Sequence, residues 1–165
     1  MSELSDDIIL LAARLGKILA ERHLSITTVE SCTGGGIAYA VTAVPGSSGW
    51  FRQGFVTYCN EAKHTLAGVE TEVLERCGAV SRETVRQMAG GGLRAAGADV
   101  SVAVSGIAGP DGGTREKPVG TVWIACAAQD RSVEQCFHFS GDRNQVRRET
   151  VRQALLMAEK MASQL

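Results

Sequence analysis

Three side chains that can act as nucleophiles, Ser31, Cys32 and Thr33, stand directly before the glycines at 34–36. A β-branched run precedes them and an apolar, helix-compatible segment follows, which predicts a strand, a sharp turn and the start of a helix. Glycines let a ligand approach the backbone closely, and free N–H groups at a helix start favour an anion or a developing oxyanion. The turn therefore offers a nucleophile beside anion stabilisation. The alternative is a simple helix cap, because serine and threonine are common capping residues.

A second strand-to-helix junction holds Tyr58 and Lys63. Residues 54–59 are predicted to form a strand, and Asn60 is expected to cap the helix that follows. This is where a second catalytic loop would lie. A lysine on a helix most often lies on the solvated surface, so Lys63 is either an ordinary surface residue or a catalytic one.

Two glycine-containing loops are further candidates for ligand contacts. The loop after the predicted strand 99–105 runs through the glycines of 106–113 to Pro118, and loops of this length are more often functional than idle. It lacks the GxxxxGK[ST] spacing of a nucleoside-triphosphate loop, but its backbone donors, with Lys117 nearby, could hold one phosphate. The cluster Pro45–Gly49 is either a connecting loop or a lip of the same pocket.

The remaining pattern predicts helices and a hairpin that position these loops. Apolar residues at helical spacing predict a first helix that ends near His23, and Ser81 and Asp142 are expected to cap two later helices. Segments 119–127 and 132–139 flank a polar turn and predict a β-hairpin, which requires a mixed sheet. The glycines at 90–92 fall inside a predicted helix. Close packing on a neighbour, such as another subunit, would explain them, and so would a break in the helix.

Composition narrows the classes of function. The chain of 165 residues is expected to form one domain over 1–165. Its 17 basic and 18 acidic residues give a net charge of −1, so nucleic-acid binding has no electrostatic support. The N-terminal segment is acidic where a signal peptide would be basic, and no apolar stretch approaches the roughly 20 residues of a membrane span, so a cytoplasmic protein is expected. The odd number of cysteines, five, and the scattered histidines predict no metal site.

Taken together, the motifs resemble those of a known family, the C-terminal domain of the competence-damage protein CinA, which also occurs as a stand-alone protein. The segments that carry the resemblance cover nearly the whole chain: 30–35 (ESCTGG), 45–48 (PGSS), 54–58 (GFVTY), 60–63 (NEAK), 78–81 (GAVS), 104–110 (VSGIAGP) and 117–122 (KPVGTV). The family contains nicotinamide-nucleotide amidohydrolases, which convert nicotinamide mononucleotide to nicotinic acid mononucleotide and ammonia.

The resemblance implies an α/β fold, a three-layer α/β/α sandwich with a mixed central sheet, and it supports Ser31, Tyr58 and Lys63 as site residues. We expect Ser31 to attack the carboxamide carbon and Lys63, made neutral by burial, to serve as its base, since no His–Asp pair can be assigned. Tyr58 would relay or donate the proton to departing ammonia. Backbone N–H groups near Thr33 and Gly34 would hold the oxyanion.

The nucleotide phosphate is expected against the 105–113 loop, at Ser105 and the N–H groups of glycines such as Gly106 and Gly109. Ser48 and Arg143 are weaker candidates for substrate contact. No metal or organic cofactor is expected. A homodimer is expected, partly from the resemblance and partly from the glycine-rich helix.

Three alternatives stay open at the level of sequence. Cys32 competes with Ser31 as the nucleophile, because a thiol at a helix N-terminus has a lowered pKa. The chain could be a catalytically silent paralogue that binds a nucleotide or a protein partner through the same pocket. It could also be an amidohydrolase for another small carboxamide.

Overall fold

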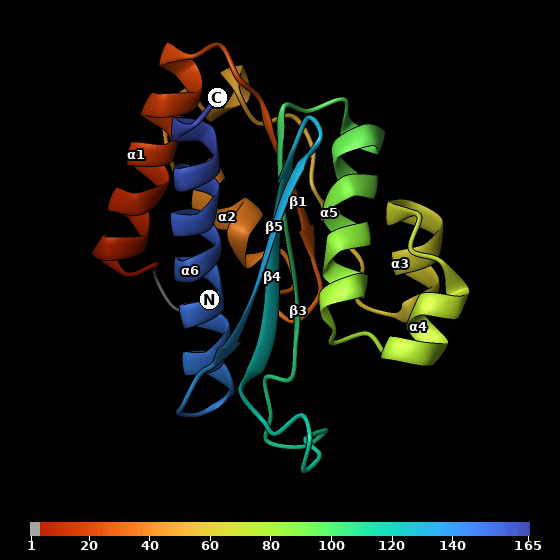
Figure 1. Ribbon diagram of the computed structural model, residues 1–165. Helices are drawn as coiled ribbons and strands as arrows, with labels where there is room; N and C mark the ends of the chain where they lie inside the picture. Colours follow the sequence, from red (N-terminus) through yellow and green to blue (C-terminus); the bar gives the residue numbers. More distant parts are fainter. Residues whose placement is uncertain (1–3) are drawn as a thin grey trace.

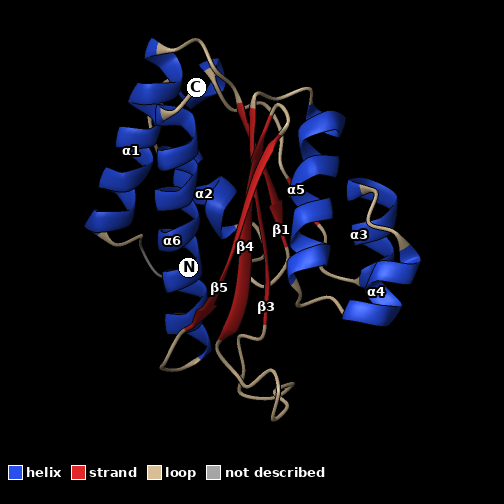
Figure 2. Ribbon diagram, viewed as in Figure 1, coloured by secondary structure: helices blue, strands red, loops and turns tan. Residues whose placement is uncertain are grey.

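A five-stranded mixed sheet lies between two layers of helices in the computed structural model, which describes residues 4–165 (Figure 1). This confirms the expected three-layer α/β/α sandwich, while the first three residues of the predicted domain 1–165 lie outside the described part. One layer contains α1, α2 and α6, and the other contains α3, α4 and α5 (Figure 2). The helices are α1 (Asp6–Glu21), α2 (Gly36–Thr42), α3 (Asn60–Ala67), α4 (Thr71–Cys77), α5 (Arg82–Ala96) and α6 (Arg143–Ser163), and a single 3₁₀ turn, η1, covers Ser47–Gly49.

The sheet has the strand order β2-β1-β3-β4-β5. Its strands are β1 (Ile26–Glu30), β2 (Phe55–Val56), β3 (Val100–Gly106), β4 (Thr121–Ala128) and β5 (Arg131–His138). Strand β1 pairs in parallel with β2 and β3, whereas β3, β4 and β5 pair antiparallel, so the predicted hairpin and mixed sheet are confirmed. All five residues of β1 are buried, as expected for a parallel strand that helices cover on both faces.

The three parallel strands end at the same edge of the sheet. Glu30, the last residue of β1, is in register with Val56 of β2 and Val104 of β3. Ligands of open α/β sheets bind outside the carboxyl ends of parallel strands. The residues that follow β1, β2 and β3 are therefore brought together at one edge.

Helix capping agrees with the sequence pattern at two of three positions. Ser81 accepts the N–H of Thr84 at the start of α5, and Asp142 forms the predicted capping box with Gln145 at the start of α6. At α3 the prediction is wrong by one residue: the Sγ of Cys59 accepts the first-turn N–H at 3.4 Å, and Asn60 is the first helical residue.

The glycines of α5 pack inside the chain. The helix is unbroken over 90–92, and a Cβ on Gly91 would collide with the carbonyl group of Ala67 at the end of α3. A Cβ on Gly92 would collide with the side chain of Val29 in β1. Close packing is thus the reason for Gly91 and Gly92, whereas a Cβ on Gly90 would meet only the end of the Arg94 side chain, at 3.5 Å. The neighbours are α3 and β1 of the same chain, so the glycines give no indication of a second subunit.

Candidate active site

Ser31 is the first residue after β1 and lies at the edge where the three parallel strands end. Its N–H donates to the carbonyl oxygen of Val104 at 3.1 Å, which joins the start of the turn to β3. Gly34 and Gly35 follow with φ angles of 58° and 99°, a region that favours glycine and allows the sharp turn into α2. The local sequence therefore holds the Ser31 hydroxyl at the end of a rigid, buried strand.

Lys63 is buried beside Ser31. Its side chain is only 1% exposed, although a lysine on a helix is usually solvated. The Nζ atom lies 3.0 Å from the Oγ of Ser31, 2.7 Å from the Thr57 carbonyl oxygen and 3.4 Å from the Tyr58 carbonyl oxygen. Burial disfavours the charged form and lowers the pKa of Lys63 from its ordinary value of 10.5.

As an ammonium, Nζ can donate to all three of these oxygens, and the same positions also suit a neutral amine. A neutral amine has two hydrogens and one lone pair. The two hydrogens can go to the carbonyl oxygens of Thr57 and Tyr58, which leaves the lone pair facing the hydroxyl hydrogen of Ser31. Lys63 is thus placed to accept a proton from Ser31, the requirement for an activated serine nucleophile.

A hollow of about 270 Å³ opens above this pair. Residues from five junctions line it: Ser31, Cys32, Tyr58, Cys59, Asn60, Lys63, Ala79, Val80, Ser105, Gly106, Ala108 and Arg143. At its rim, Arg143 donates to the hydroxyl oxygen of Tyr58 at 3.1 Å and to the carbonyl oxygen of Gly109 at 2.8 Å. Arg143 thereby connects the start of α6 with the junctions after β2 and β3.

Cys32 lies beside the same hollow but in a poor state for nucleophilic attack. The residue is 6% exposed, and burial raises the pKa of its thiol to about 11. The expectation of a lowered pKa at a helix start is therefore wrong here. A protonated thiol is a weak nucleophile, so the electrostatics favour Ser31.

The start of α2 does not offer free N–H groups, which corrects a second expectation. The side chain of Glu30 is 1% exposed and accepts from the N–H groups of Ile37 and Ala38 at 2.8 and 2.9 Å. It also accepts from the hydroxyl group of Thr33 at 2.6 Å. The charge of Glu30 therefore already occupies the anion site at this helix end.

Among the described residues, the turn leaves three other backbone N–H groups without a backbone acceptor, those of Cys32, Thr33 and Gly35. Gly34 does not have the free N–H that was expected, because it donates to the Ser31 carbonyl oxygen at 3.0 Å. Within the described chain, the N–H groups of Cys32 and Thr33 make no backbone hydrogen bond in this turn. Thr33 and Gly34 were predicted to hold the oxyanion. Of these two, only Thr33 has an N–H available for it, and the N–H of Cys32 lies next to it in the chain.

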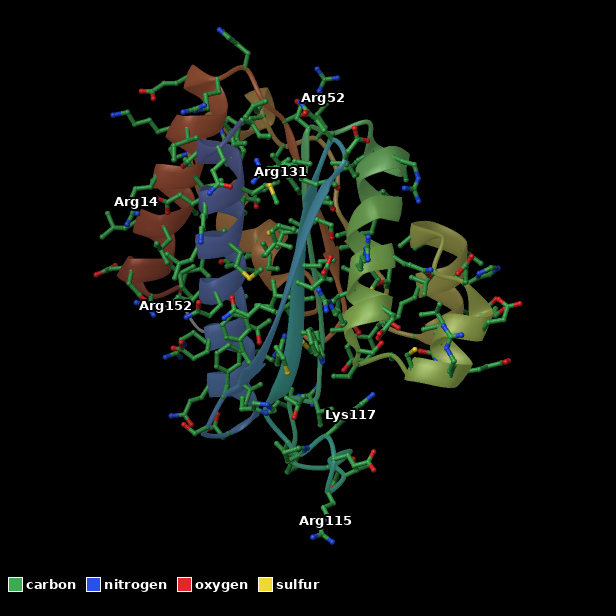
Figure 3. The ribbon with its side chains drawn as sticks, viewed as in Figure 1. Arg14, Arg52, Arg115, Lys117, Arg131 and Arg152 are labelled. Atoms are coloured by element: carbon green, nitrogen blue, oxygen red, sulfur yellow. The ribbon has the colours of Figure 1, made fainter. Side chains whose placement is uncertain are left out.

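The predicted phosphate contacts divide into two groups. Ser105 and Gly106 line the hollow at the end of β3. Gly109, in contrast, presents its carbonyl oxygen to Arg143. Lys117 is directed elsewhere, because its Nζ donates to the carbonyl oxygen of Cys77 at 2.8 Å, and Arg115 projects from the tip of the same loop (Figure 3).

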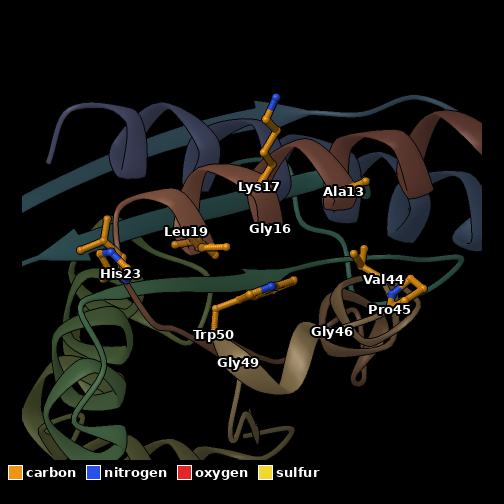
Figure 4. Close-up of a pocket in the computed structure, with 12 residues that line it drawn as sticks. Ala13, Gly16, Lys17, Leu19, His23, Val44, Pro45, Gly46, Gly49 and Trp50 are labelled. Atoms are coloured by element: carbon orange, nitrogen blue, oxygen red, sulfur yellow. The ribbon is translucent and has the colours of Figure 1, made fainter.

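Ser48 is not part of this hollow. It is exposed in η1, next to Trp50, whose carbonyl oxygen accepts from the N–H of Ile26 at the opposite end of β1 from Ser31. A hollow of about 660 Å³ adjoins that region between α1 and the turn 45–50, and Lys17 points away from it (Figure 4). No serine, threonine or cysteine is among its lining residues. The chain therefore does not bring Ser48 to the Ser31–Lys63 pair.

Two charged residues at the turn were not identified as functional from the sequence, Glu30 and Arg147. A glutamate at the end of a fully buried strand is unusual, and that was the available signal for Glu30. Arg147 of α6 donates to the carbonyl oxygens of Cys32 and Thr33 at 3.1 and 3.3 Å. Arg147 lies four residues after Arg143, which places both on one face of the helix. This spacing was the only feature of the sequence that could have indicated a role for Arg147.

Two negative findings apply to residues 4–165. No group of three or more histidine, cysteine or acidic side chains is placed to hold a metal ion. None of the helices described there is long and apolar enough to cross a membrane.

Comparison with known proteins agrees with this architecture. A family model described as the CinA C-terminal domain matches residues 9–162. The chain is 51% identical over 150 residues to nicotinamide-nucleotide amidohydrolase PncC of Escherichia coli K12, covering 90% of this chain and 91% of that protein. It is 52% identical over 150 residues to the PncC of Pseudomonas putida, covering 91% and 94%.

Solved structures show the same fold. The competence/damage inducible protein CihA from Agrobacterium tumefaciens is 45% identical, with a TM-score of 0.93 over 97% of this chain and 99% of that one. A CinA superfamily protein from Klebsiella pneumoniae is 36% identical, with a TM-score of 0.92 over 96% of this chain and 99% of the other.

Proposed function

The chain belongs to the CinA C-terminal domain family, and from this membership we propose that it hydrolyses the carboxamide of nicotinamide mononucleotide to nicotinic acid mononucleotide and ammonia. The observation that carries the proposal is the buried pair of Ser31 and Lys63, with 3.0 Å between Oγ and Nζ at the floor of an open hollow. Relatives that share half of the sequence are named for this reaction, and the pair supplies the chemistry that the reaction needs.

The first half of the proposed reaction forms an acyl-enzyme. Neutral Lys63 takes the hydroxyl proton of Ser31 as the oxygen attacks the carboxamide carbon. The tetrahedral intermediate places its negative oxygen near the N–H groups of Cys32 and Thr33. Ammonia then leaves with the proton of the Lys63 ammonium, passed directly or relayed through the hydroxyl of Tyr58, which Arg143 holds. The C–N bond breaks, and the acyl group stays on Ser31.

The second half returns the enzyme to its starting state. Lys63, neutral again, takes a proton from a water molecule that attacks the ester carbon. The Ser31 oxygen leaves and regains its proton from Lys63. The Lys63 amine, 3.0 Å from the Ser31 Oγ, carries the proton in both halves, so this mechanism requires no metal or organic cofactor.

Arg143 is the cation available at the mouth of the hollow for the substrate phosphate, with Ser105 and Gly106 on the adjacent wall. Because a guanidinium group binds phosphate oxygens in a bidentate manner, we assign the phosphate to this side. Removing the phosphate should then raise KM far more than it lowers kcat.

The test is to incubate the purified chain with nicotinamide mononucleotide and to quantify ammonia and nicotinic acid mononucleotide. Equal amounts of both products support the proposal. Nicotinamide riboside, which lacks the phosphate, and free nicotinamide serve as comparison substrates. Binding without release of ammonia would indicate a silent paralogue, and faster release from another carboxamide would indicate a different substrate.

We also propose a homodimer in the cytoplasm, the assembly and location expected from the sequence. The family resemblance supports the dimer, whereas the glycines of α5 do not, because their neighbours lie in the same chain. Light scattering during size-exclusion chromatography measures the molar mass in solution, and a monomer would contradict the proposed dimer.

A further inference from the structure

We propose that Arg147 is a positioning residue, which holds the turn that carries Ser31 in its reactive geometry from the side opposite the substrate. This inference rests on the proposed amide hydrolysis and goes beyond it, since Arg147 is absent from the residues that line the Ser31 hollow.

Arg147 and Arg143 act on different sides of the same turn. Both lie on α6, one helical turn apart, and Arg143 lines the substrate hollow. Arg147 instead lines a separate hollow of about 360 Å³ behind the turn, together with Thr33 of the turn, residues of α1 and α2, and further residues of α6 that include Arg148. Arg147 does not line the Ser31 hollow, and its contacts with the site are those it makes with the carbonyl groups of the turn, so we assign its effect to the turn.

The contacts of Arg147 fix the orientation of peptide groups. Its Nε donates to the Cys32 carbonyl oxygen at 3.1 Å, and its Nη2 donates to the Thr33 carbonyl oxygen at 3.3 Å. In a trans peptide the C=O and the N–H point in opposite directions. Holding the Cys32 carbonyl therefore directs the N–H of Thr33 away from Arg147. This N–H is one of the candidate donors for the oxyanion.

The rest of the turn is fixed by other contacts, which makes Arg147 the missing constraint. Ser31 is joined to β3 through its N–H, and Gly34 donates back to the Ser31 carbonyl. Glu30 holds the Thr33 side chain and the start of α2. Among the described residues, the Arg147 guanidinium group is the only side chain that hydrogen-bonds the peptide between Cys32 and Thr33.

The experiment compares wild type with Arg147→Ala, Arg147→Lys and Arg148→Ala. Arg148 is the adjacent, exposed residue of α6 and serves as the matched control. Loss of an oriented oxyanion donor predicts that Arg147→Ala lowers kcat on the order of 100-fold with KM changed less than about threefold. Arg147→Lys should be intermediate, because one ammonium cannot replace a planar fork on two carbonyl oxygens. Arg148→Ala should match wild type.

Rescue separates a positioning role from a purely structural one. The hollow behind the turn opens to solvent beside Arg147, so added guanidinium should enter the Arg147→Ala protein and restore part of kcat. Methylammonium should restore much less. Unchanged kcat in Arg147→Ala, a rise in KM alone, or a loss that follows the melting temperature and resists guanidinium would each overturn the inference.

A second readout does not depend on the natural substrate. A fluorophosphonate probe phosphonylates an activated serine: the serine Oγ attacks phosphorus, fluoride leaves, and the phosphoryl oxygen takes the place of the oxyanion. Mass spectrometry locates the adduct. Slower labelling of Ser31 in Arg147→Ala than in Arg148→Ala supports the inference even if wild type fails to release ammonia from nicotinamide mononucleotide. Equal labelling rates would refute it. Failure of the proposed substrate is thus distinguished from failure of the positioning role.

Discussion

Replacing Lys63 by methionine is the most informative single change, because the two side chains are similar in length and only the methionine lacks the basic nitrogen. The Nζ atom is the only nitrogen or carboxylate of a side chain that hydrogen-bonds the Ser31 Oγ among the described residues. Removing a general base lowers kcat by roughly 10²–10⁴-fold. We expect a loss of that size, with KM changed much less, because the Lys63 amine faces Ser31 at the floor of the hollow.

The pH dependence follows from the state of the amine. Lys63 is active when neutral, and burial lowers its pKa below 10.5. The kcat/KM of wild type should therefore rise with pH, by about tenfold per pH unit on the acidic limb, since one proton is removed. Ammonia release from nicotinamide mononucleotide across a pH series measures this limb.

The free energy of unfolding should also change with pH, because it is linked to the protonation of Lys63. The unfolded chain binds the Lys63 proton more tightly than the folded chain, so the free energy of unfolding rises with pH between the lowered folded pKa and 10.5. Lys63→Met lacks this term. The melting temperature of wild type, relative to the variant, should consequently be higher at about pH 10 than at about pH 7.

Two results would refute the assignment. Lys63→Arg keeps a permanent cation but cannot act as a base, so activity in that variant would mean that Lys63 contributes charge rather than proton transfer. A kcat/KM that is flat or falls between neutral and alkaline pH would also contradict a neutral amine.

Three further predictions concern the frame of the site. Glu30→Gln should lower the free energy of unfolding by about 2 kcal/mol in urea titrations, because an amide cannot accept from all three donors that the carboxylate binds; an unchanged midpoint would contradict this. Gly91→Ala should destabilise by about 2 kcal/mol or more, since its Cβ would meet backbone. Gly90→Ala, whose Cβ would meet only the end of the Arg94 side chain at an ordinary contact distance, should stabilise by up to about 1 kcal/mol; calorimetry that shows equal effects would disprove the packing argument. Tyr58→Phe should lower kcat by about 10–100-fold at an unchanged melting temperature, because the ring is 60% exposed and only the hydroxyl held by Arg143 is lost; full activity would exclude a proton-donating role.

The local sequence pattern predicted the helices and strands well, because each of them depends on residues close together in the sequence. The periodicity of α1, the capping box at Asp142 and the alternation in the hairpin all arise from residues a few positions apart. The placement of Ser31 after a buried strand followed from the same kind of signal. These features required no knowledge of distant contacts.

The features that local pattern could not supply depend on residues far apart in the sequence. Lys63 is buried with its amine against residues that follow β1 and β2, and its own helix gives no sign of this. The Glu30 carboxylate reaches seven and eight residues ahead to cap α2, which removed the anion site expected there. Arg147 acts on a turn 114 residues earlier. Such contacts appear only once the chain is folded.

The central claim is that Ser31, activated by Lys63, is the nucleophile of an amide hydrolysis. Ammonia release from nicotinamide mononucleotide by wild type, Ser31→Ala and Cys32→Ala, measured side by side, tests it most directly. We predict that Ser31→Ala is inactive and that Cys32→Ala stays close to wild type, because the Cys32 thiol is protonated at neutral pH. Release by Ser31→Ala together with loss in Cys32→Ala would contradict the account and assign the nucleophile to the thiol.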